Sequence, residues 1–450
     1  MPPDMPDFSP ERDQQFRRMR EVAREIFGSA LKNASIENAF ARNIHCERRV
    51  LRIGEDLHDL DSYQRVFVVS IGKAAHTMAA ALEAQVGSGI EGLVALSADP
   101  ENQIRGFRYF RGGHPTPTAE SIRAADAILK SLTALDATSL AIFMISGGAS
   151  SIVEKPVDHE ILLPDLAATY RTLVHSGAPI AEINAIRKHL SAVKGGRLAQ
   201  AAYPAQQVSI LVSDVPDATP DALASGPTMP DSTSIRDCER IAAQYNLVEQ
   251  FPQSVADLFR QHALDETPKS DDPAFVRARW WTVLSNKVAI DEAGAAATRA
   301  GFAVEVDNSC DDWPYDKAAS YLLQRLRELR LRVSRVCLIS GGEVTVTVRN
   351  GGVGGRNQQF ALACAEPISG DNITVLSAGT DGIDGNSPAA GAVVDGSTIF
   401  RADPSAGGAD AVRRALSAFD AYPVFEALGD AIITGPTGNN VRDLRILLAY

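Results

Sequence analysis

The sequence predicts an α/β protein whose strands are mostly parallel. Five short apolar runs end in serine and then turn into loops that contain glycine, lysine or carboxylate residues. The five serines are Ser70, Ser146, Ser213, Ser340 and Ser377. Runs of Val, Ile and Leu that are apolar on both faces are typical of buried parallel strands, and such sheets bind ligands outside the carboxyl ends of their strands. The loops therefore predict one or two polar crevices and an enzyme that handles an anionic ligand.

Length and composition agree with this fold class and exclude others. A chain of 450 residues suggests two or three domains, and 45% hydrophobic with 22% charged residues is ordinary globular material. The net charge of −12 argues against a general nucleic-acid or anionic-membrane surface. Five cysteines without CxxC or Cys/His spacing argue against disulfides and structural zinc. With no basic-then-apolar leader and no apolar stretch near the ~18 residues that span a bilayer, we expect a soluble, cytoplasmic protein.

Strands and helices alternate along the first half of the chain, which predicts right-handed βαβ units. A first helix is expected to end near Leu31. The expected strands are 66–71, 93–97, 139–145 and 207–213. The expected helices are 73–86, 118–132, 159–176, 179–190 and 195–202.

The second half of the chain predicts a mixed sheet. Its expected strands are 281–285, 302–306, 335–340, 343–349, 373–378, 390–394 and 444–449. The segment 343–349 alternates Val and Thr, which is typical of a half-exposed antiparallel strand. It then runs into a glycine-rich loop.

The loop after the first buried strand reads Ser70-Ile-Gly72-Lys73 and opens a helix. Backbone N–H groups at a helix N-terminus and a lysine can share one phosphate. This is not a Walker A loop, because Phe67 stands where the leading glycine would be and Ala74 where the Ser/Thr would be. A lysine at a turn with its head in water is the alternative interpretation.

A second loop, Ser146-Gly147-Gly148-Ala149-Ser150, follows the next buried strand. Consecutive glycines with small hydroxyl residues suit a nest around a carboxylate or phosphate, although a tight turn with serine caps has the same composition.

Cations and acids follow in the same half. Arg187 and Lys194 belong to a cluster of cations that could bind a phosphorylated ligand or line a solvated helix face. Asp214 follows the strand that ends at Ser213 and could act as a general base, hold Mg²⁺, or only cap a turn. His114 lies in a Gly-Gly-His-Pro turn and could touch substrate, but a structural turn histidine is the favoured interpretation.

The second half supplies a glycine loop and further acids. Gly354 and Gly355 end a run of four glycines in five residues that leads into Arg356 and Asn357. Such a backbone can approach a polyanion closely while the arginine binds it bidentately. The loop lacks the GxGxxG order of a dinucleotide fingerprint. Glu343 follows Ser340-Gly-Gly, and Asp381 lies in a Thr-Asp-Gly turn.

Nine motifs carry a resemblance to a known family. They are SIGKAA, GGHPTP, SGGASS, RKHLSAVKGGRLA, LVSDVPD with ASGPT, SGGE, GGRNQ, GTDGIDG and GPTGNNVRDL, in this order. The chain resembles the class II glycerate 2-kinases with a C-terminal MOFRL domain over about residues 10–450. The resemblance implies a Rossmann-like, mostly parallel α/β/α domain at 10–245. A smaller α/β domain with a mixed sheet would occupy 246–450, contain the MOFRL region at about 335–445, and share an active-site cleft with the first.

The resemblance implies ATP- and Mg²⁺-dependent phosphorylation of D-glycerate at its 2-hydroxyl. The essential lysine falls on Lys73 and the essential arginine on Arg356, which would converge from opposite domains on the transferred phosphoryl group. Asp214 or Asp381 would accept the hydroxyl proton or orient the metal, and Glu343 would be a metal ligand. Substrate and phosphate contacts are expected from the following residues: Ser70, Gly72, Ser146, Gly147, Gly148, Ala149, Ser150, Arg187, Lys194, Gly354, Gly355 and Asn357.

The expected partners are D-glycerate and a nucleotide, with no nucleic acid and no membrane, and a homodimer is compatible with the sequence. An NAD(P)H-dependent reductase of hydroxypyruvate or tartronate semialdehyde is the alternative enzyme, against which we count the lack of a dinucleotide fingerprint with its ribose-binding acid. A catalytically silent phosphosugar or nucleotide sensor is a third interpretation.

Overall fold

The computed structural model describes residues 9–348, 351–402 and 408–450. It divides into two compact units. The first unit is 36–284, and the second unit joins the N-terminal segment up to Ser35 with 285–450. The predicted boundary at 245/246 differs from this division at both ends, because the first helix belongs to the second unit and 246–284 belong to the first. Within the described ranges, none of the helices has the length and apolar character needed to cross a bilayer.

The first unit is built on a six-stranded sheet in which every neighbouring pair is parallel. Its strands are β4 (Arg65–Ile71), β5 (Glu91–Leu96), β6 (Phe107–Arg111), β7 (Ser139–Ile145), β8 (Gln206–Val212) and β9 (Ala278–Leu284). The order across the sheet is β6-β5-β4-β7-β8-β9, which is the doubly wound order of dinucleotide-binding folds. All seven residues of β7 are buried. The parallel sheet predicted from the apolar runs is therefore confirmed, and so is the Rossmann-like domain that the resemblance implied.

Sequence patterns missed three features of this unit. Strand β6 was not predicted, because its sequence FRYFR alternates polar and aromatic residues instead of forming an apolar run. Strand β9 was expected to open the second domain but pairs in parallel with β8 as the sixth strand. A small antiparallel sheet of β1 (Ile44–Glu47), β2 (Val50–Ile53) and β3 (Asp56–Asp59) precedes the main sheet.

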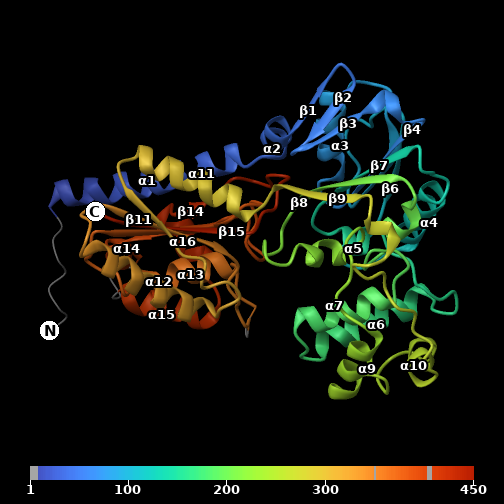
Figure 1. Ribbon diagram of the computed structural model, residues 1–450. Helices are drawn as coiled ribbons and strands as arrows, with labels where there is room; N and C mark the ends of the chain where they lie inside the picture. The colour runs from blue at the N-terminus through green and yellow to red at the C-terminus, as the bar shows by residue number, and fades with distance from the viewer. Residues whose placement is uncertain (1–8, 349–350, 403–407) are drawn as a thin grey trace. The chain divides into compact units, whose positions relative to one another are not determined.

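The five helices predicted at 73–86, 118–132, 159–176, 179–190 and 195–202 are all found, with ends that differ by at most a few residues. The helices of the first unit are α2 (Ile36–Asn43), α3 (Ala75–Val86), α4 (Ala119–Leu132), α5 (Ala149–Ile152), α6 (Leu163–His175), α7 (Ile180–His189), α8 (Arg197–Ala202), α9 (Ile235–Gln244) and α10 (Gln253–Arg260), with 3-10 turns η1 (Leu60–Ser62), η2 (Pro220–Ser225) and η3 (Pro273–Phe275). Helices α6, α7, α9 and α10 share a hydrophobic core of their own and lie together in Figure 1.

The second unit has the predicted mixed sheet. Its strands, in spatial order, are β10 (Ala303–Val306), β11 (Val336–Gly342), β15 (Asp443–Ala449), β12 (Ile373–Gly379), β13 (Gly391–Asp395) and β14 (Ala431–Ile432). Among the described strands of this sheet, only β10 and β11 pair in parallel.

The prediction of a strand at 343–349 is wrong for the described part of that segment. Residues 343–348 form one isolated bridge, between Thr345 and Pro314, and 349–350 lie outside the described residues. The Glu343 N–H donates to Asp311 Oδ1 at 3.0 Å instead of joining a β-ladder. Alternation of Val and Thr therefore did not suffice, because the backbone of the described part of this segment bonds to Asp311, Asp312 and Trp313 of a neighbouring loop.

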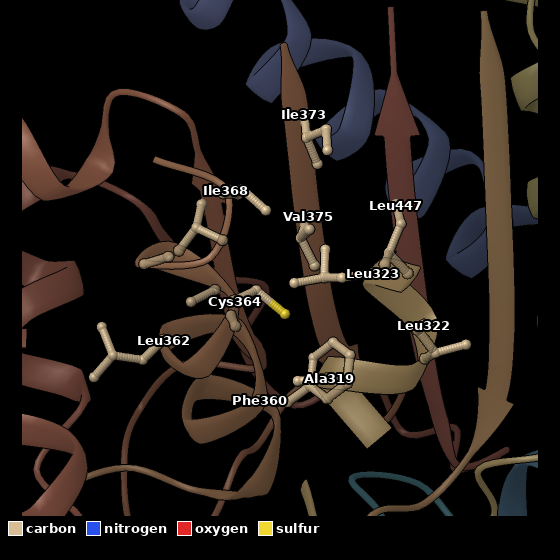
Figure 2. Close-up of a cluster of buried hydrophobic side chains, with 14 of the residues drawn as sticks. Ala319, Leu322, Leu323, Phe360, Leu362, Cys364, Ile368, Ile373, Val375 and Leu447 are labelled. Carbon is tan, nitrogen blue, oxygen red and sulfur yellow. The ribbon is translucent and has the colours of Figure 1, made fainter. Parts of the chain in front are cut away.

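Helices cover both faces of the second sheet (Figure 1). Helices α1 (Pro10–Asn33) and α11 (Asn286–Arg299) pack on one face, and α12 (Tyr315–Arg330), α13 (Arg356–Ala365) and α15 (Gly408–Ala418) lie on the other. Two shorter helices are α14 (Thr398–Ala402) and α16 (Tyr422–Leu428). Figure 2 shows the core beneath α12 and α13, where Leu323 and Phe360 meet Val375 of β12 and Leu447 of β15.

A buried charge network attaches α1 to the second unit. The Arg20 guanidinium pairs with Asp395, whose side chain is fully buried, and with Asp430 at 3.3 Å. Arg401 also binds Asp430, at 2.5 Å. Two carboxylates in a low-dielectric interior require compensating cations, and Arg20 supplies one of them from α1. This explains why the first helix belongs with residues that lie more than 350 positions away in the sequence.

Replacing Arg20 by methionine is expected to lower the free energy of unfolding by roughly 3 kcal/mol, because Asp395 would stay buried with less compensating charge. Arg18→Met is the matched control on the same helix, since Arg18 pairs with two glutamates at exposed positions, and such pairs contribute about 0–1 kcal/mol. Urea unfolding followed by circular dichroism measures both. Equal stability of the two variants would contradict the role given to Arg20.

Candidate functional site

The loops that follow β4 and β7 meet where the strand order of the first sheet reverses. The Lys73 N–H donates to Gly147 O at 2.9 Å, and the Ala74 N–H donates to Ser146 Oγ at 3.1 Å. Parallel α/β sheets bind ligands in the crevice at such a reversal. Lys73 itself is exposed, and among the described residues its ammonium has no ion-pair or hydrogen-bond partner. The lysine is thus free to bind an anion at this edge.

Asp214 lies against the same glycine loop. A Cβ atom built on Gly147 would lie 2.0 Å from Asp214 Oδ2, so any side chain at this position would displace the carboxylate. Asp214 follows β8, the neighbour of β7 in the sheet. The structure therefore brings together Lys73, the glycine loop and Asp214, as the sequence predicted.

His114 joins this cluster, although the sequence favoured a structural role for it. A Cβ atom built on Gly148 would lie 3.1 Å from Lys73 Cγ and 3.3 Å from His114 Nδ1, so the two side chains flank one glycine. His114 Nδ1 is 3.1 Å from Ser151 Oγ. Partial burial and the Lys73 charge lower the pKa of His114 below its usual value. The position of His114 in the sequence could have predicted this. His114 follows β6, and the carboxyl ends of parallel strands lie at one edge of a sheet.

Several predicted contact residues have internal roles. Ser70 Oγ is buried and donates to Ala75 O at 2.7 Å, which fixes the first turn of α3. Gly72 is buried within the same turn. Ala149 is buried at the start of α5, whereas Ser150 is half-buried. Of the predicted loop residues, Gly148, Ser150 and Lys73 are the more accessible ones.

Lys194 lies in a buried network and not at the accessible edge. Its ammonium pairs with Glu154, which also accepts hydrogen bonds from Tyr170 Oη at 2.6 Å and Ser191 Oγ at 2.5 Å. Arg187 stacks on the Tyr170 ring, with its guanidinium carbon 4.4 Å from the ring centroid. Burial lowers the pKa of Lys194 to about 8. Because Glu154 follows shortly after α5, these groups hold the end of the Ser146–Ser151 loop in place.

In the second unit, Arg356 is held by two carboxylates. It is the first residue of α13 and donates to Asp443 at 2.6 and 3.1 Å, while its Nη2 lies 2.8 Å from Glu343 Oε1. Burial opposes the charge, but Asp443 and Glu343 hold the pKa of Arg356 above its usual value. Burial raises the pKa of Glu343 despite the arginine. Glu343, predicted as a metal ligand, thus has an arginine as its partner in this structure.

The turn that carries Glu343 is fixed by a second ion pair. Asp311 accepts the Glu343 N–H at 3.0 Å and receives two bonds from Arg442, at 2.6 and 2.7 Å. Sequence reasoning gave no role to Asp311, Arg442 or Asp443. Arg442 and Asp443 lie within the GPTGNNVRDL motif, whereas Asp311 lies in none of the nine motifs.

Asp384 anchors the start of α13 and was also missed. Its carboxylate accepts the N–H of Asn357 at 3.1 Å and that of Gln358 at 2.9 Å. Burial raises the pKa of Asp384 to about 6, while these hydrogen bonds oppose the rise. Asn357 is buried, and its Oδ1 accepts from Ser377 Oγ at 2.6 Å. Asn357 therefore positions the helix that presents Arg356.

Asp381 lies near Asp443. A Cβ atom built on Gly379 would lie 3.0 Å from Asp381 Oδ1 and 3.4 Å from Asp443 Oδ1. Asp381 is half-buried and also accepts the Ile383 N–H at 3.1 Å.

The glycine loop before Arg356 is fixed by side chains rather than open. The Val353 N–H donates to Asp420 Oδ1 at 2.8 Å, and the Gly354 N–H donates to Asn386 Oδ1 at 2.9 Å. Gly355 precedes α13 as its N-cap. Asn350, which opens the motif, lies outside the described residues.

The described residues contain no group of three or more His, Cys, Asp or Glu side chains that could hold a metal ion by themselves. Mg²⁺ in phosphoryl-transfer enzymes is held by one or two carboxylates together with substrate phosphates and water. Asp214 in the first unit and Asp381 in the second are each a half-buried carboxylate at a strand end, so either one is of the required kind. Glu343 fits this requirement less well because Arg356 already balances its charge.

Comparison with known proteins matches both units. Residues 22–260 match the family described as "Domain of unknown function (DUF4147)", and residues 336–443 match the MOFRL family. The chain is 35% identical over 390 residues to D-glycerate 2-kinase of Thermotoga maritima, covering 85% of this chain and 90% of that one. This chain belongs to the class II glycerate 2-kinase family.

Two further proteins are similar to this chain over nearly its whole length. The crystal structure of a glycerate kinase from Thermotoga maritima superposes with a TM-score of 0.83 at 31% identity, covering 96% of this chain and 100% of that one. A protein of Agrobacterium vitis named "Putative hydroxypyruvate reductase" is 35% identical over 438 residues, with 95% and 94% of the two chains covered. The fold and the family predicted from the motifs are both confirmed.

The Glu154→Gln variant is expected to be destabilised by roughly 3 kcal/mol, because Lys194 would remain buried without its carboxylate. Glu160→Gln is the control at an exposed position nearby and should change stability by less than about 0.5 kcal/mol. The double variant Glu154→Gln/Lys194→Met should recover most of the loss. Thermal and urea unfolding measure all three, and a double variant no more stable than the single one would contradict this explanation.

Proposed function

We propose that the protein transfers the γ-phosphoryl group of ATP to the 2-hydroxyl of D-glycerate, giving 2-phosphoglycerate and ADP. The observation that carries this proposal is the gathering of Lys73, the Ser146–Ser151 loop and Asp214 at the reversal of the parallel strand order. Family membership supports the kinase chemistry. The Thermotoga maritima relative, a D-glycerate 2-kinase, supports the choice of substrate and of the hydroxyl.

Two cations have the central electrostatic role in this proposal. Phosphoryl transfer needs reactants held in line and charge neutralised on the moving group, rather than covalent chemistry by the protein. Lys73 would bind phosphoryl oxygens as a point charge, and Arg356 would bind them through its planar guanidinium. Glu343 and Asp443 orient Arg356 before the ligand arrives, so little side-chain entropy is lost when it binds.

Asp214 or Asp381 would hold Mg²⁺, which supplies neutralisation of the charge on the nucleotide phosphates when it is bound. The exposed part of the Ser146–Ser151 loop, with Gly148 and Ser150, would bind either the glycerate carboxylate or a nucleotide phosphate. Lys194 and Arg187 would act on this loop indirectly, through Glu154 and Tyr170.

A reductase activity is the second candidate, because of the name that the Agrobacterium vitis relative carries. The turn after β4 has a single glycine, Gly72, where a dinucleotide-binding turn would have three. A GxGxxG match at Gly87–Gly92 runs from the end of α3 into β5, the reverse of the strand-to-helix order that binds a pyrophosphate. Incubation with hydroxypyruvate and NADH, followed by absorbance, tests this candidate, and we expect no NADH oxidation.

Lys73→Ala is expected to lower kcat/KM for ATP-dependent glycerate phosphorylation by about 10²- to 10³-fold with little change in stability, because the lysine is exposed. Lys130→Ala, at an exposed lysine on α4, is the control. A coupled assay that separates 2- from 3-phosphoglycerate measures the product. Near-normal turnover of Lys73→Ala would refute the role of this lysine.

Arg356→Lys is the sharper test of the arginine, since Arg356→Ala would also leave Asp443 buried without a partner. The lysine keeps the charge but loses the bidentate geometry, so we expect a folded protein with turnover reduced by at least about 10-fold. Arg332→Lys, at an exposed position, serves as the control. If Arg356→Lys turns over at the wild-type rate, Arg356 does not bind the phosphoryl group in the manner proposed.

A further inference from the structure

His114 has one ring nitrogen engaged and the other open. Its Nδ1 lies 3.1 Å from Ser151 Oγ, while no hydrogen bond to Nε2 is found among the residues that the structure describes. The side chain as a whole is exposed. The imidazole is thus anchored at Nδ1, while Nε2 is open.

The Ser151 hydroxyl bears on which nitrogen of His114 carries the proton, because a hydroxyl hydrogen rotates to suit its partners. Ser151 Oγ can donate its single hydrogen to Gly148 O at 3.3 Å. In that arrangement the oxygen accepts from the ring, and the imidazole proton lies on Nδ1. Nε2 of this tautomer has a free lone pair and is the basic nitrogen.

The surroundings of the ring favour its neutral form. Partial burial and the neighbouring Lys73 ammonium both lower the pKa of His114. Asp214, the other charged group of the cluster, approaches Gly147, whereas Lys73 and His114 flank Gly148. A neutral imidazole beside the lysine that binds the phosphoryl group is suited to accept a proton from a hydroxyl that attacks that group.

We propose that His114 is a further catalytic residue, whose Nε2 accepts the proton of the substrate hydroxyl that is phosphorylated. This inference rests on the kinase activity proposed above. As the hydroxyl oxygen forms its bond to the γ-phosphorus, the bond from that phosphorus to the bridging oxygen breaks and ADP leaves with the electron pair. The hydroxyl proton moves to Nε2 and is later released from the imidazolium to water.

His114→Asn separates a catalytic role from a structural one. The asparagine amide can still donate toward Ser151 in place of Nδ1–H, but it has no basic nitrogen. We expect kcat to fall by about 10²-fold, KM for glycerate and ATP to change by less than about 3-fold, and the melting temperature to stay close to that of the wild type. His175→Asn, at an exposed histidine on α6, is the matched control and should keep wild-type kinetics.

Chemical rescue provides a readout that a purely structural role would not change. Free imidazole added to His114→Ala should restore kcat in proportion to its concentration, because the small base can occupy the space that the side chain has left. The same imidazole should not raise the activity of Lys73→Ala. Rescue of His114→Ala alone supports the inference.

The outcomes distinguish this inference from the proposed function. Absence of ATP-dependent glycerate phosphorylation in the wild type would refute the proposed function itself. An active wild type together with a His114→Asn variant whose kcat lies within about 3-fold of it would overturn the role of His114. Lack of rescue by imidazole, with kcat of His114→Asn near that of the wild type, would assign His114 to the turn alone.

Discussion

The reversal of strand order between β4 and β7 is the constraint on which the candidate site depends. The two strands pair in parallel in register from Arg65 with Ser139 to Ile71 with Ile145, so their carboxyl ends lie level. The chain leaves them through loops that cross the end of the sheet and hydrogen-bond to each other through Lys73 and Gly147. Strand β8 adds Asp214 at the same level. Backbone pairing of the strands thus brings these loops together, independently of contacts between their side chains.

Glycine makes that gathering sterically feasible. Gly147 lies against the Asp214 carboxylate, and Gly148 lies between Lys73 and His114, so a methyl group at either position would crowd a polar side chain. The buried Glu154 and Lys194 then fix the far end of the loop. Burying this ion pair has a large desolvation cost, so its main contribution is to fix the geometry of the loop. That is the role of a structural support and not of a binding surface.

The second unit arranges charge in a different way. There the catalytic candidate Arg356 is balanced by Glu343 and Asp443, and Asp384 accepts two backbone N–H groups in the first turn of α13. An arginine oriented in this way can exchange part of its carboxylate contact for phosphoryl oxygens without reorganising the helix. The first unit presents an exposed lysine, whereas the second presents an arginine whose geometry is set in advance. The two cations therefore contribute differently to the proposed reaction, one by charge and one by directed hydrogen bonds.

The sequence by itself determined the buried strands, the helices between them, the loops with Lys73, Gly147, Asp214 and Arg356, and the family. These follow from local patterns of apolar residues, turn residues and motifs. The tertiary structure alone decided that α1 joins the second unit, that 246–284 complete the first sheet, and that Lys194 and Asn357 are internal supports. It also placed His114 beside Lys73. The physical reason is that burial and ion pairing join residues that are far apart in the chain, such as Arg20 with Asp395, and no local pattern records such partners.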